Sequence, residues 1–376
     1  MSYFGYLDHN ATTPVRPEAA AAAAQVFAMT GNPSSVHRFG REMRGRLEDA
    51  RERVAGLVNA APAGVVFTSG GTEANALAVR GCGRRRVLMS AVEHASVRAA
   101  APAAEPIAVD GDGVIDCEAL EAMLVAGSEP ALVAVMLANN ETGVIQPVAE
   151  VAALARRHGA LVHCDAVQAA GKIAIDAGAL GVHFLSVSAH KIGGPAGSGA
   201  VVVCGDAPLA AELGGGGQER GRRAGTENLA GIVGFGVAAE SAAADLSAAG
   251  RLAHWRDDLE RRLTALAPTA PVFGAGAARL PNTSCLAMPG VTSAVQLMAF
   301  DLAGLAVSAG SACSSGKIGR SHVLEAMGVA AEVAANAIRI SLGWTTTVQE
   351  IDRLVGAWGA LYARAGAGPR HTAPAA

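Results

Sequence analysis

The sequence carries almost no net charge. Lys plus Arg is 30 and Asp plus Glu is 33 in 376 residues, so the formal charge is −3. A chain with this balance has no general electrostatic attraction to nucleic acid or to an anionic membrane surface. We therefore expect neither nucleic acid nor a membrane among its partners.

The sequence also lacks a convincing membrane span or signal peptide. Two stretches longer than ~18 residues have no charged side chain, 19–37 and 280–300, but both contain proline and polar residues that interrupt a spanning helix. No basic segment precedes an apolar run at the N-terminus, and Asp8 stands where a signal peptide is hydrophobic. The sequence predicts a cytoplasmic protein.

The six cysteines form no C-x-x-C pair, so neither a disulfide framework nor a four-thiolate zinc site is indicated, and no metal is expected. Five of them lie in or beside apolar or small-residue stretches, which is typical of small buried hydrophobes. Those five are Cys82, Cys117, Cys164, Cys204 and Cys285. Cys313 differs, because it lies in a run of small residues, 308–316, that cannot pack a core.

Apolar runs and helical segments alternate along residues 16–250, which predicts an α/β domain built on a mostly parallel sheet. The runs are continuously apolar because parallel strands are covered on both faces. Seven runs are strand candidates: VVFTS, RVLMS, PIAVD, ALVAVML, ALVHCD, FLSVS and GAVVVC.

The rest of the chain, 251–376, predicts a smaller α+β unit, joined to the first by a long helical stretch from 227 to about 266. Its strand candidates are TSCLAM, LAVSAG and AIRISLG, and its helix candidates cover 292–303, 321–327 and 348–363.

Ligands of an open parallel sheet bind beyond the carboxyl ends of the strands. The first strand runs into Ser-Gly-Gly-Thr-Glu and then a helix, so Gly71 and Thr72 offer backbone room, a hydroxyl and the positive end of a helix dipole. This pattern describes a phosphate cradle, although such a turn also joins strands to helices without binding anything.

Three more strand ends carry reactive side chains. Asp165, with Gln168 one turn on, either caps a helix or acts as counter-ion of a cationic heterocycle. Lys191 precedes a long uncharged loop. Although most loop lysines are solvated, these surroundings favour an amine with a lowered pKa, which can attack a carbonyl group. His94 either stacks on a planar ring or moves protons, or else is structural. One explanation covers all four ends: pyridoxal phosphate (PLP) bound covalently to Lys191.

At this point the chain resembles a family, the NifS-type cysteine desulfurases of the PLP-dependent class-V aminotransferase group. The matching segments extend from one end of the chain to the other. They are YLDHNATTP (6–14), GNPSSVHRFG (31–40), VFTSGGTEANALA (66–78), VEHASV (92–97), ANNETGVIQP (138–147), HCDAVQAAGK (163–172), SVSAHKIGGPAGSGA (186–200), GGGGQERGRRAGTEN (214–228), RLPNTS (279–284), SAGSACSSG (308–316) and IRISLG (338–343).

The resemblance implies fold type I of the PLP-dependent transferases, with a small domain built from residues 1–15 and 251–376, and a homodimer. It also implies a role for each matching residue. Lys191 is the Schiff-base lysine, Asp165 and Gln168 contact the pyridine ring, His94 stacks on it, and Thr72, Ser188 and His190 hold the phosphate; Thr226 reaches the phosphate of the other subunit, and Asn140 and Arg339 hold the substrate.

Two of these residues also make sense by themselves. Arg339 lies in an apolar strand and needs an anionic partner, which is either a substrate carboxylate or a protein carboxylate. Cys313 lies in a segment suited to movement, and Lys317 and Arg320 nearby favour its thiolate. A thiol of this kind fits a nucleophile that takes sulfur from a substrate as a persulfide and carries it onward.

We therefore expect conversion of L-cysteine to L-alanine, with sulfur passing through Cys313 to an acceptor protein such as an iron–sulfur scaffold. The alternatives within the fold are an aminotransferase and a selenocysteine lyase; a silent sulfur-relay scaffold is a third. A nucleotide-binding loop over 310–317 fails, because it has one residue too many between its glycines and Ile318 where Ser or Thr is needed. Relatives commonly carry Leu-Glu-Pro where this chain has Ile318-Gly319-Arg320, which leaves the docking of the acceptor open.

Overall fold

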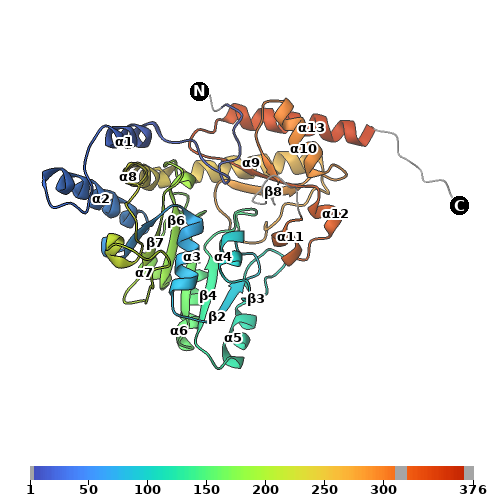
Figure 1. Cartoon of the computed structure of the whole chain (residues 1–376). Helices are drawn as coiled ribbons and strands as arrows, with labels where there is room; N and C mark the ends of the chain where they lie inside the picture. Colours follow the sequence, from blue (N-terminus) through green and yellow to red (C-terminus); the bar gives the residue numbers. More distant parts are fainter. Residues whose placement is uncertain (1–3, 310–319, 368–376) are drawn as a thin grey trace.

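The computed structural model describes residues 4–309 and 320–367 (Figure 1). In this part of the chain the larger sheet has seven strands. Its order is β1 (Val65–Thr68), β7 (Gly199–Val203), β6 (Phe184–Ser188), β5 (Leu161–Asp165), β4 (Ala131–Met136), β2 (Arg86–Ser90) and β3 (Glu105–Ile107). Strands β6, β5, β4, β2 and β3 are parallel, whereas β7 is antiparallel to both β1 and β6. The predicted seven-stranded, mostly parallel sheet is confirmed.

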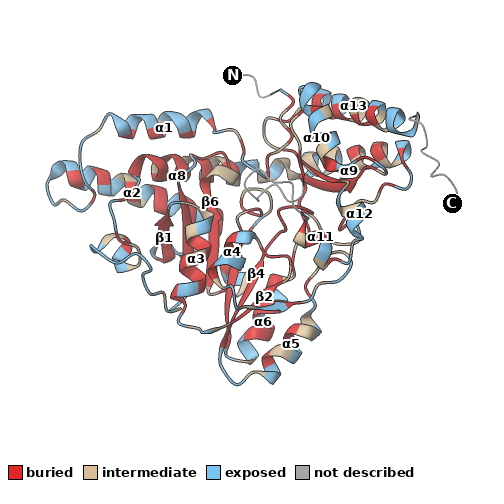
Figure 2. Cartoon of the chain, turned by 45° about the vertical axis from the view of Figure 1, so that its right-hand side comes forward, coloured by how far each residue is buried: buried red, intermediate tan, exposed pale blue. Residues whose placement is uncertain are grey.

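Helices cover both faces of this sheet, which explains the continuous apolar runs. Alternate residues of β4 show the division: Val133 and Val135 pack in one core, and Leu132 and Ala134 in the other. The first core includes α1 (Pro17–Phe27), α2 (Arg38–Leu57), α5 (Cys117–Ala126), α6 (Val148–Arg157), α7 (Ala177–Leu180) and α8 (Leu229–Ala244); the second includes α3 (Gly71–Gly81) and α4 (Ala95–Ala100). Figure 2 shows the buried strands between these layers.

The second sheet is antiparallel, in the order β8 (Thr283–Ala287), β10 (Ala337–Ser341), β9 (Ser308–Ala309). Its helices are α9 (Ala249–Leu266), α10 (Ser293–Leu302), α11 (His322–Ala326), α12 (Ala331–Ala334) and α13 (Val348–Ala367), of which α12 was not expected from the sequence. The N-terminal segment joins this sheet, because Tyr6 forms a parallel bridge with Ala306 and Asp8 with Ser341. The division at residues 15 and 250 stays a prediction.

The predicted connecting helix is interrupted. Helix α8 runs into a short 3-10 turn, η4 (Asp245–Ala248), before α9 begins. By length and composition, 229–266 is apolar enough to cross a membrane, but half of its most apolar window is buried inside the fold. Helix α8 is apolar because it is a core helix, packed against α1 and α2.

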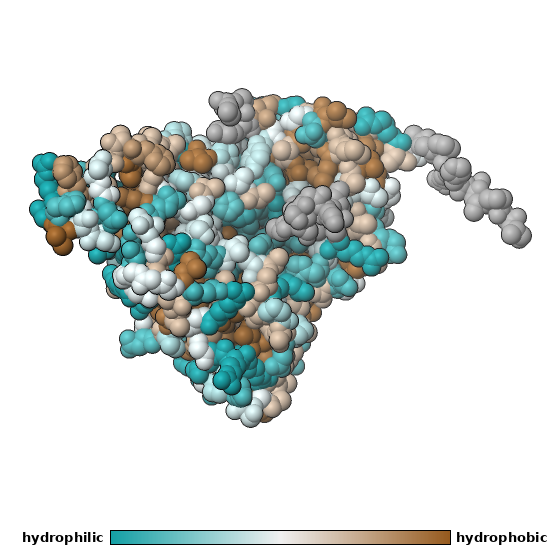
Figure 3. Space-filling model, viewed as in Figure 1, coloured by the Kyte–Doolittle hydropathy of each residue, from teal (hydrophilic) through white to brown (hydrophobic). Residues whose placement is uncertain are grey.

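Several large apolar side chains are exposed on the surface. On the face shown in Figure 3, brown residues gather at the upper right near α10, where Val295, Met298 and Leu302 are exposed. The cysteines at 82, 117, 164, 204 and 285 are free, and the first, third and fifth of them are buried. In the described residues, no group of three or more His, Cys, Asp and Glu side chains is arranged to hold a metal ion.

Candidate active site

A cavity of about 400 Å³ opens where the carboxyl ends of the parallel strands meet the smaller sheet. Strands β5 and β6 end on its wall at Asp165 and Ser188, and β10 contributes Arg339 from the other side. Ten residues predicted from the sequence line this cavity. They are Gly71, Thr72, His94, Asn140, Asp165, Gln168, Ser188, His190, Lys191 and Arg339.

One end of the cavity has the features of an anion cradle. A Cβ atom on Gly71 would lie 2.9 Å from Cγ2 of Val167, so the close approach of this loop requires glycine. Thr72 follows in the first turn of α3, where backbone N–H groups have no partner within the helix. The Ser188 hydroxyl is buried and has no hydrogen-bond partner among the described residues. A buried hydroxyl of this kind fits a ligand that accepts its proton.

Asp165, which also lines the cavity, is held by one side chain and one backbone N–H group. Its Oδ1 accepts the N–H of Val167 at 2.9 Å, and its Oδ2 accepts from Nδ2 of Asn75 at 2.7 Å. The structural alternative, a cap on a following helix, is wrong, because a turn and not a helix follows β5; the carboxylate stabilises this turn and also lines the cavity. The two roles do not exclude each other, since a carboxylate has several acceptor positions.

Asn75 links Asp165 to His94. Its amide group also donates to the Ser96 hydroxyl at 2.9 Å, and that hydroxyl contacts Nδ1 of His94 at 2.8 Å. The Nδ1 atom also accepts the backbone N–H of Ser96. Because Nδ1 accepts this N–H, the tautomer of His94 that fits the contact carries its proton on Nε2. Asn75 was part of a matching motif but was not singled out, because spacing alone does not show which side of α3 faces Asp165.

Lys191 stands at the end of η2 (Ala189–Lys191), directly after β6. Its amine donates to the backbone carbonyl oxygens of Asn10 and Ala11, the latter at 2.8 Å. Burial and the charge of Lys191 lower the pKa of the adjacent His190 to about 4, so that this ring is neutral near pH 7. The N-terminal loop thus forms one wall around the amine.

Arg339 has a protein partner as well as a free donor. Its side chain is 2 % exposed; Nη2 contacts Oδ1 of Asp8 at 2.7 Å and Nη1 donates to the backbone oxygen of Asn140 at 2.8 Å. Its buried Nε has no partner in residues 4–309 and 320–367. Asp8 is thus the protein carboxylate that was one alternative for the anionic partner of Arg339. The unpartnered Nε is compatible with the other alternative, a substrate carboxylate.

Two buried carboxyl groups near the cavity were not foreseen. Burial raises the pKa of Glu141 to about 7, and this group accepts the Ser321 hydroxyl at 2.6 Å. Burial and the neighbouring Asp165 raise the pKa of Glu93 well above its usual value. Both lie in segments that matched the family, but the pattern does not reveal which residues of a loop become buried.

Thr226 is the one described site residue of the prediction that does not line this cavity. Thr226 lines a separate cavity of about 80 Å³ together with Arg223 and Glu227. Cys313 lies outside the described residues, as do Ile318 and Gly319 of the departure from the family pattern.

Comparison with known proteins decides the family. The model of the aminotransferase class-V family matches residues 5–354. The chain is 46% identical over 365 residues to a cysteine desulfurase of Cereibacter sphaeroides, covering 93% of each chain. The chain belongs to the cysteine desulfurases of the class-V aminotransferase family.

Two further relatives agree with this assignment. A cysteine desulfurase of Klebsiella pneumoniae is 42% identical over 361 residues, covering 93% of this chain and 90% of the relative. An X-ray structure of a NifS-like protein from Rickettsia africae has a TM-score of 0.89 at 34% identity, covering 96% of this chain and 99% of that one. The chain therefore has the fold of the class-V aminotransferases, as predicted.

Proposed function

We propose that this chain converts L-cysteine to L-alanine with PLP as its cofactor and passes the sulfur through Cys313 to an acceptor protein. The observation that carries the proposal is the meeting of ten matching residues in one cavity, from segments as distant as Gly71 and Arg339. The relatives' names support the same activity.

The cavity fits PLP at both ends. We assign the phosphate to Gly71, Thr72, Ser188 and His190, because the unpartnered Ser188 hydroxyl and the first turn of α3 need an acceptor there. We assign the ring to Asp165, Gln168 and His94, and the covalent attachment to Lys191. When bound, PLP supplies an electron sink for the pair left when a Cα–H bond breaks.

The side chains then have distinct tasks. Arg339 binds the carboxylate of L-cysteine through N–H groups that Asp8 and Asn140 do not use, beside Asn140. Lys191 takes the proton from the substrate Cα and returns it, because its amine lies in the same cavity. Asp165 provides the negative charge that a protonated ring nitrogen requires. The backbone oxygens of Asn10 and Ala11 orient the amine of Lys191.

The sulfur step balances without an external oxidant. The Cys313 thiolate attacks the substrate sulfur, an S–S bond forms, and the C–S bond of the substrate breaks. The electron pair of that bond stays on the substrate carbon, which gains a proton to become the methyl group of alanine. The products are L-alanine and a persulfide on Cys313, which an acceptor in iron–sulfur cluster assembly or related sulfur trafficking then consumes.

We further propose that the working form is a homodimer in the cytoplasm. Thr226, expected to hold phosphate, lies in a cavity apart from the other phosphate residues of its own chain. This separation supports the expectation that it serves the site of a second copy. The bacterial origin of the relatives supports the cytoplasmic location.

The test uses the full chain loaded with PLP. Replacing Cys313 by Ala should preserve the yellow colour but abolish alanine release from L-cysteine and persulfide labelling. The control, Cys117→Ala, removes a half-buried thiol on α5 and should retain both products. Alanine formed at the normal rate by Cys313→Ala would refute the nucleophile, and formation of a keto acid instead would identify an aminotransferase.

A further inference from the structure

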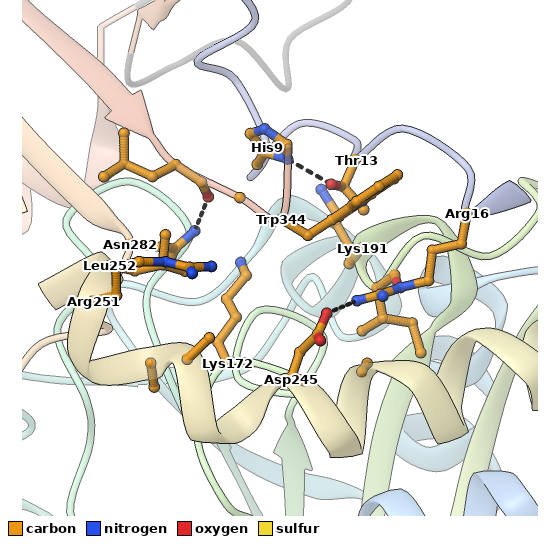
Figure 4. Close-up of a pocket in the computed structure, with 17 residues that line it drawn as sticks. His9, Thr13, Arg16, Lys172, Lys191, Asp245, Arg251, Leu252, Asn282 and Trp344 are labelled. Atoms are coloured by element: carbon orange, nitrogen blue, oxygen red, sulfur yellow. Dashed lines mark hydrogen bonds and ion pairs between the residues drawn. The ribbon is translucent and has the colours of Figure 1, made fainter. Parts of the chain in front are cut away.

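Arg51 of α2 and Glu219 form an ion pair that is shielded from water on both sides. Nη1 and Nη2 of Arg51 donate to Oε2 and Oε1 of Glu219 at 2.8 and 2.9 Å, and the two side chains are 4% and 1% exposed. Another pair between distant segments, Arg16 with Asp245 at 2.7 Å (Figure 4), has a carboxylate that is 47% exposed. The removal of either Arg51 or Glu219 would therefore leave a buried charge without compensation.

The Arg51–Glu219 pair covers the free edge of β1, which lies at one side of the seven-stranded sheet. The backbone N–H of Phe67 donates to Oε2 of Glu219 at 2.8 Å, and Nη1 of Arg51 donates to the backbone oxygen of Val65 at 2.8 Å. The pair thus supplies the acceptor and the donor that a neighbouring strand would supply. Glu219 in this way attaches its loop to the strand that leads into the anion cradle at Gly71.

The backbone at Glu219 is in a conformation that needs support. Glu219 and Arg220 have φ values of 46° and 59°, in the left-handed region that favours glycine. Within residues 4–309 and 320–367, the one other non-glycine residue with a positive φ is Asn59, and asparagine tolerates this region better than most residues. Two successive residues of this kind persist only where the surrounding contacts hold them, and such strain is concentrated at functional sites.

The loop that contains Glu219, residues 218–228, carries Thr226 at the surface. Arg223 ties the loop to α3, because its Nε donates to Oε1 of Glu73 at 2.9 Å, and Oε2 of Glu73 accepts the backbone N–H of Ser69 at 2.7 Å. Thr226, three residues further on, is exposed and does not line the substrate cavity of its own chain. The loop is therefore fixed on its inner side, whereas Thr226 faces outward.

We propose that Arg51 and Glu219 are positioning residues for Thr226: their ion pair holds the loop 218–228 so that the Thr226 hydroxyl donates to the cofactor phosphate in the site of a second copy. This inference rests on the proposed function, in which Thr226 serves the other copy of a homodimer. The alternative is an action within one chain, through the link from Arg223 to Glu73 beside the cradle. The exposed position of Thr226 favours the second copy.

The first test measures PLP binding by the full chain. Glu219→Gln keeps the shape of the side chain but removes its charge. Samples at increasing PLP concentration are reduced with borohydride, which fixes the cofactor on Lys191, and the loaded fraction is counted from the mass of the intact chain. We expect the dissociation constant to rise about tenfold, as for the loss of one hydrogen bond to a charged group.

The matched control for this test is Glu260→Gln. It breaks another bidentate pair, in which Arg279 donates to Glu260 at 2.7 and 2.8 Å, with side chains that are 7% and 12% exposed. Neither residue lines the substrate cavity, so the control should bind PLP like the parent chain. A Glu219→Gln chain that binds PLP as tightly as the control would overturn the proposal.

A double substitution tests whether the pair acts through Thr226. Thr226→Val removes the hydroxyl from an exposed position and should by itself weaken PLP binding about tenfold. Adding Glu219→Gln to this variant should weaken binding little further, because both substitutions remove the same contact. A second loss of about the same size in the double variant would show another route and contradict the positioning of Thr226.

Hybrid dimers show in which copy the pair acts. A Glu219→Gln chain is assembled with a Lys191→Ala chain, and hybrids with two different tags are isolated. Borohydride then fixes PLP at position 191 of the Glu219→Gln chain alone. When Thr226 comes from the other copy, this site receives an intact loop, and its dissociation constant returns to that of the parent chain. A constant that stays about tenfold higher would show action within one chain and refute the proposal.

Arg51→Lys serves in the same hybrids if Glu219→Gln does not fold. It keeps the charge but lacks the fork that binds both carboxylate oxygens, so the dissociation constant should rise by about threefold in its own dimer and recover in the hybrid. No rise, or no recovery, refutes the proposal, as does a parent chain that binds PLP as a monomer. Because the readout is cofactor binding, a chain that behaves as expected here but releases no alanine fails the proposed function alone.

Discussion

Asp8 and Arg339 form an ion pair of 2.7 Å between the N-terminal segment and β10, and both side chains are largely shielded from water. The parallel bridge between Asp8 and Ser341 brings the carboxylate to this position. Arg339 consequently has a resident counter-ion while one of its donors, Nε, remains unpartnered. The charge is stabilised before any substrate carboxylate arrives.

Replacing Asp8 by Asn should destabilise the protein, because it leaves the Arg339 guanidinium buried without a carboxylate. Breaking a buried pair in this way costs about 3 kcal/mol. The free energy of unfolding, measured with urea on the cofactor-free chain, is the readout. The control is Asp352→Asn, which breaks the exposed pair with Arg262 and should cost under about 1 kcal/mol. Equal effects of the two substitutions would contradict a special role for Asp8.

Replacing Asn75 by Ala should weaken cofactor binding about tenfold, because Asp165 loses an amide donor and Ser96 loses the contact that turns its hydroxyl toward His94. The dissociation constant of PLP, measured from the visible band, tests this expectation. Asn59→Ala is the matched control, because it also removes an amide that donates to an aspartate, here the exposed Asp176, which does not line the cavity. An Asn75→Ala chain that binds PLP like the control would remove Asn75 from the site.

The titration of Glu141 should lower the free energy of unfolding as the pH rises. Burial raises the pKa of Glu141 to about 7 in the folded chain, above its unfolded value near 4.5. Between these values the folded state holds more protons than the unfolded state, so stability is fully present below about pH 4.5 and is lost toward pH 7.

Replacing Glu141 by Gln mimics the protonated group and should abolish that loss. We expect the free energy of unfolding of the variant, measured with urea, to rise relative to that of the parent chain by about 2–3 kcal/mol between pH 4.5 and pH 8. Glu150→Gln, an exposed substitution at the start of α6, controls for the change in net charge. A difference that does not vary with pH would show that folding does not raise the pKa of Glu141.

The local parts of the fold follow from the sequence. Continuous apolar runs such as 131–136 predict strands covered on both faces, and the reactive residues at their ends, Asp165 and Lys191 among them, do line one cavity. This works because strand formation and the residue after a strand depend on neighbours a few positions away. The roles of individual residues rested on the family resemblance, and all of these roles, those of Thr226 and Cys313 included, stay predictions.

The contacts around those residues could not be predicted in the same way. Asn10 meets Lys172 and Lys191, and Asp8 meets Arg339, across separations of more than a hundred residues. Such pairings depend on how the N-terminal segment joins the smaller sheet, which no local periodicity encodes.

The order of residues along the chain thus determined the fold class, the strands and the identity of the reactive side chains, because each depends on short-range patterns of polarity and on residue chemistry. The tertiary structure alone decided their environment: which amide faces the cavity, which carboxyl group is buried, and which amines share Asn10. Burial and the proximity of charges set proton affinities, and both arise when distant segments pack together.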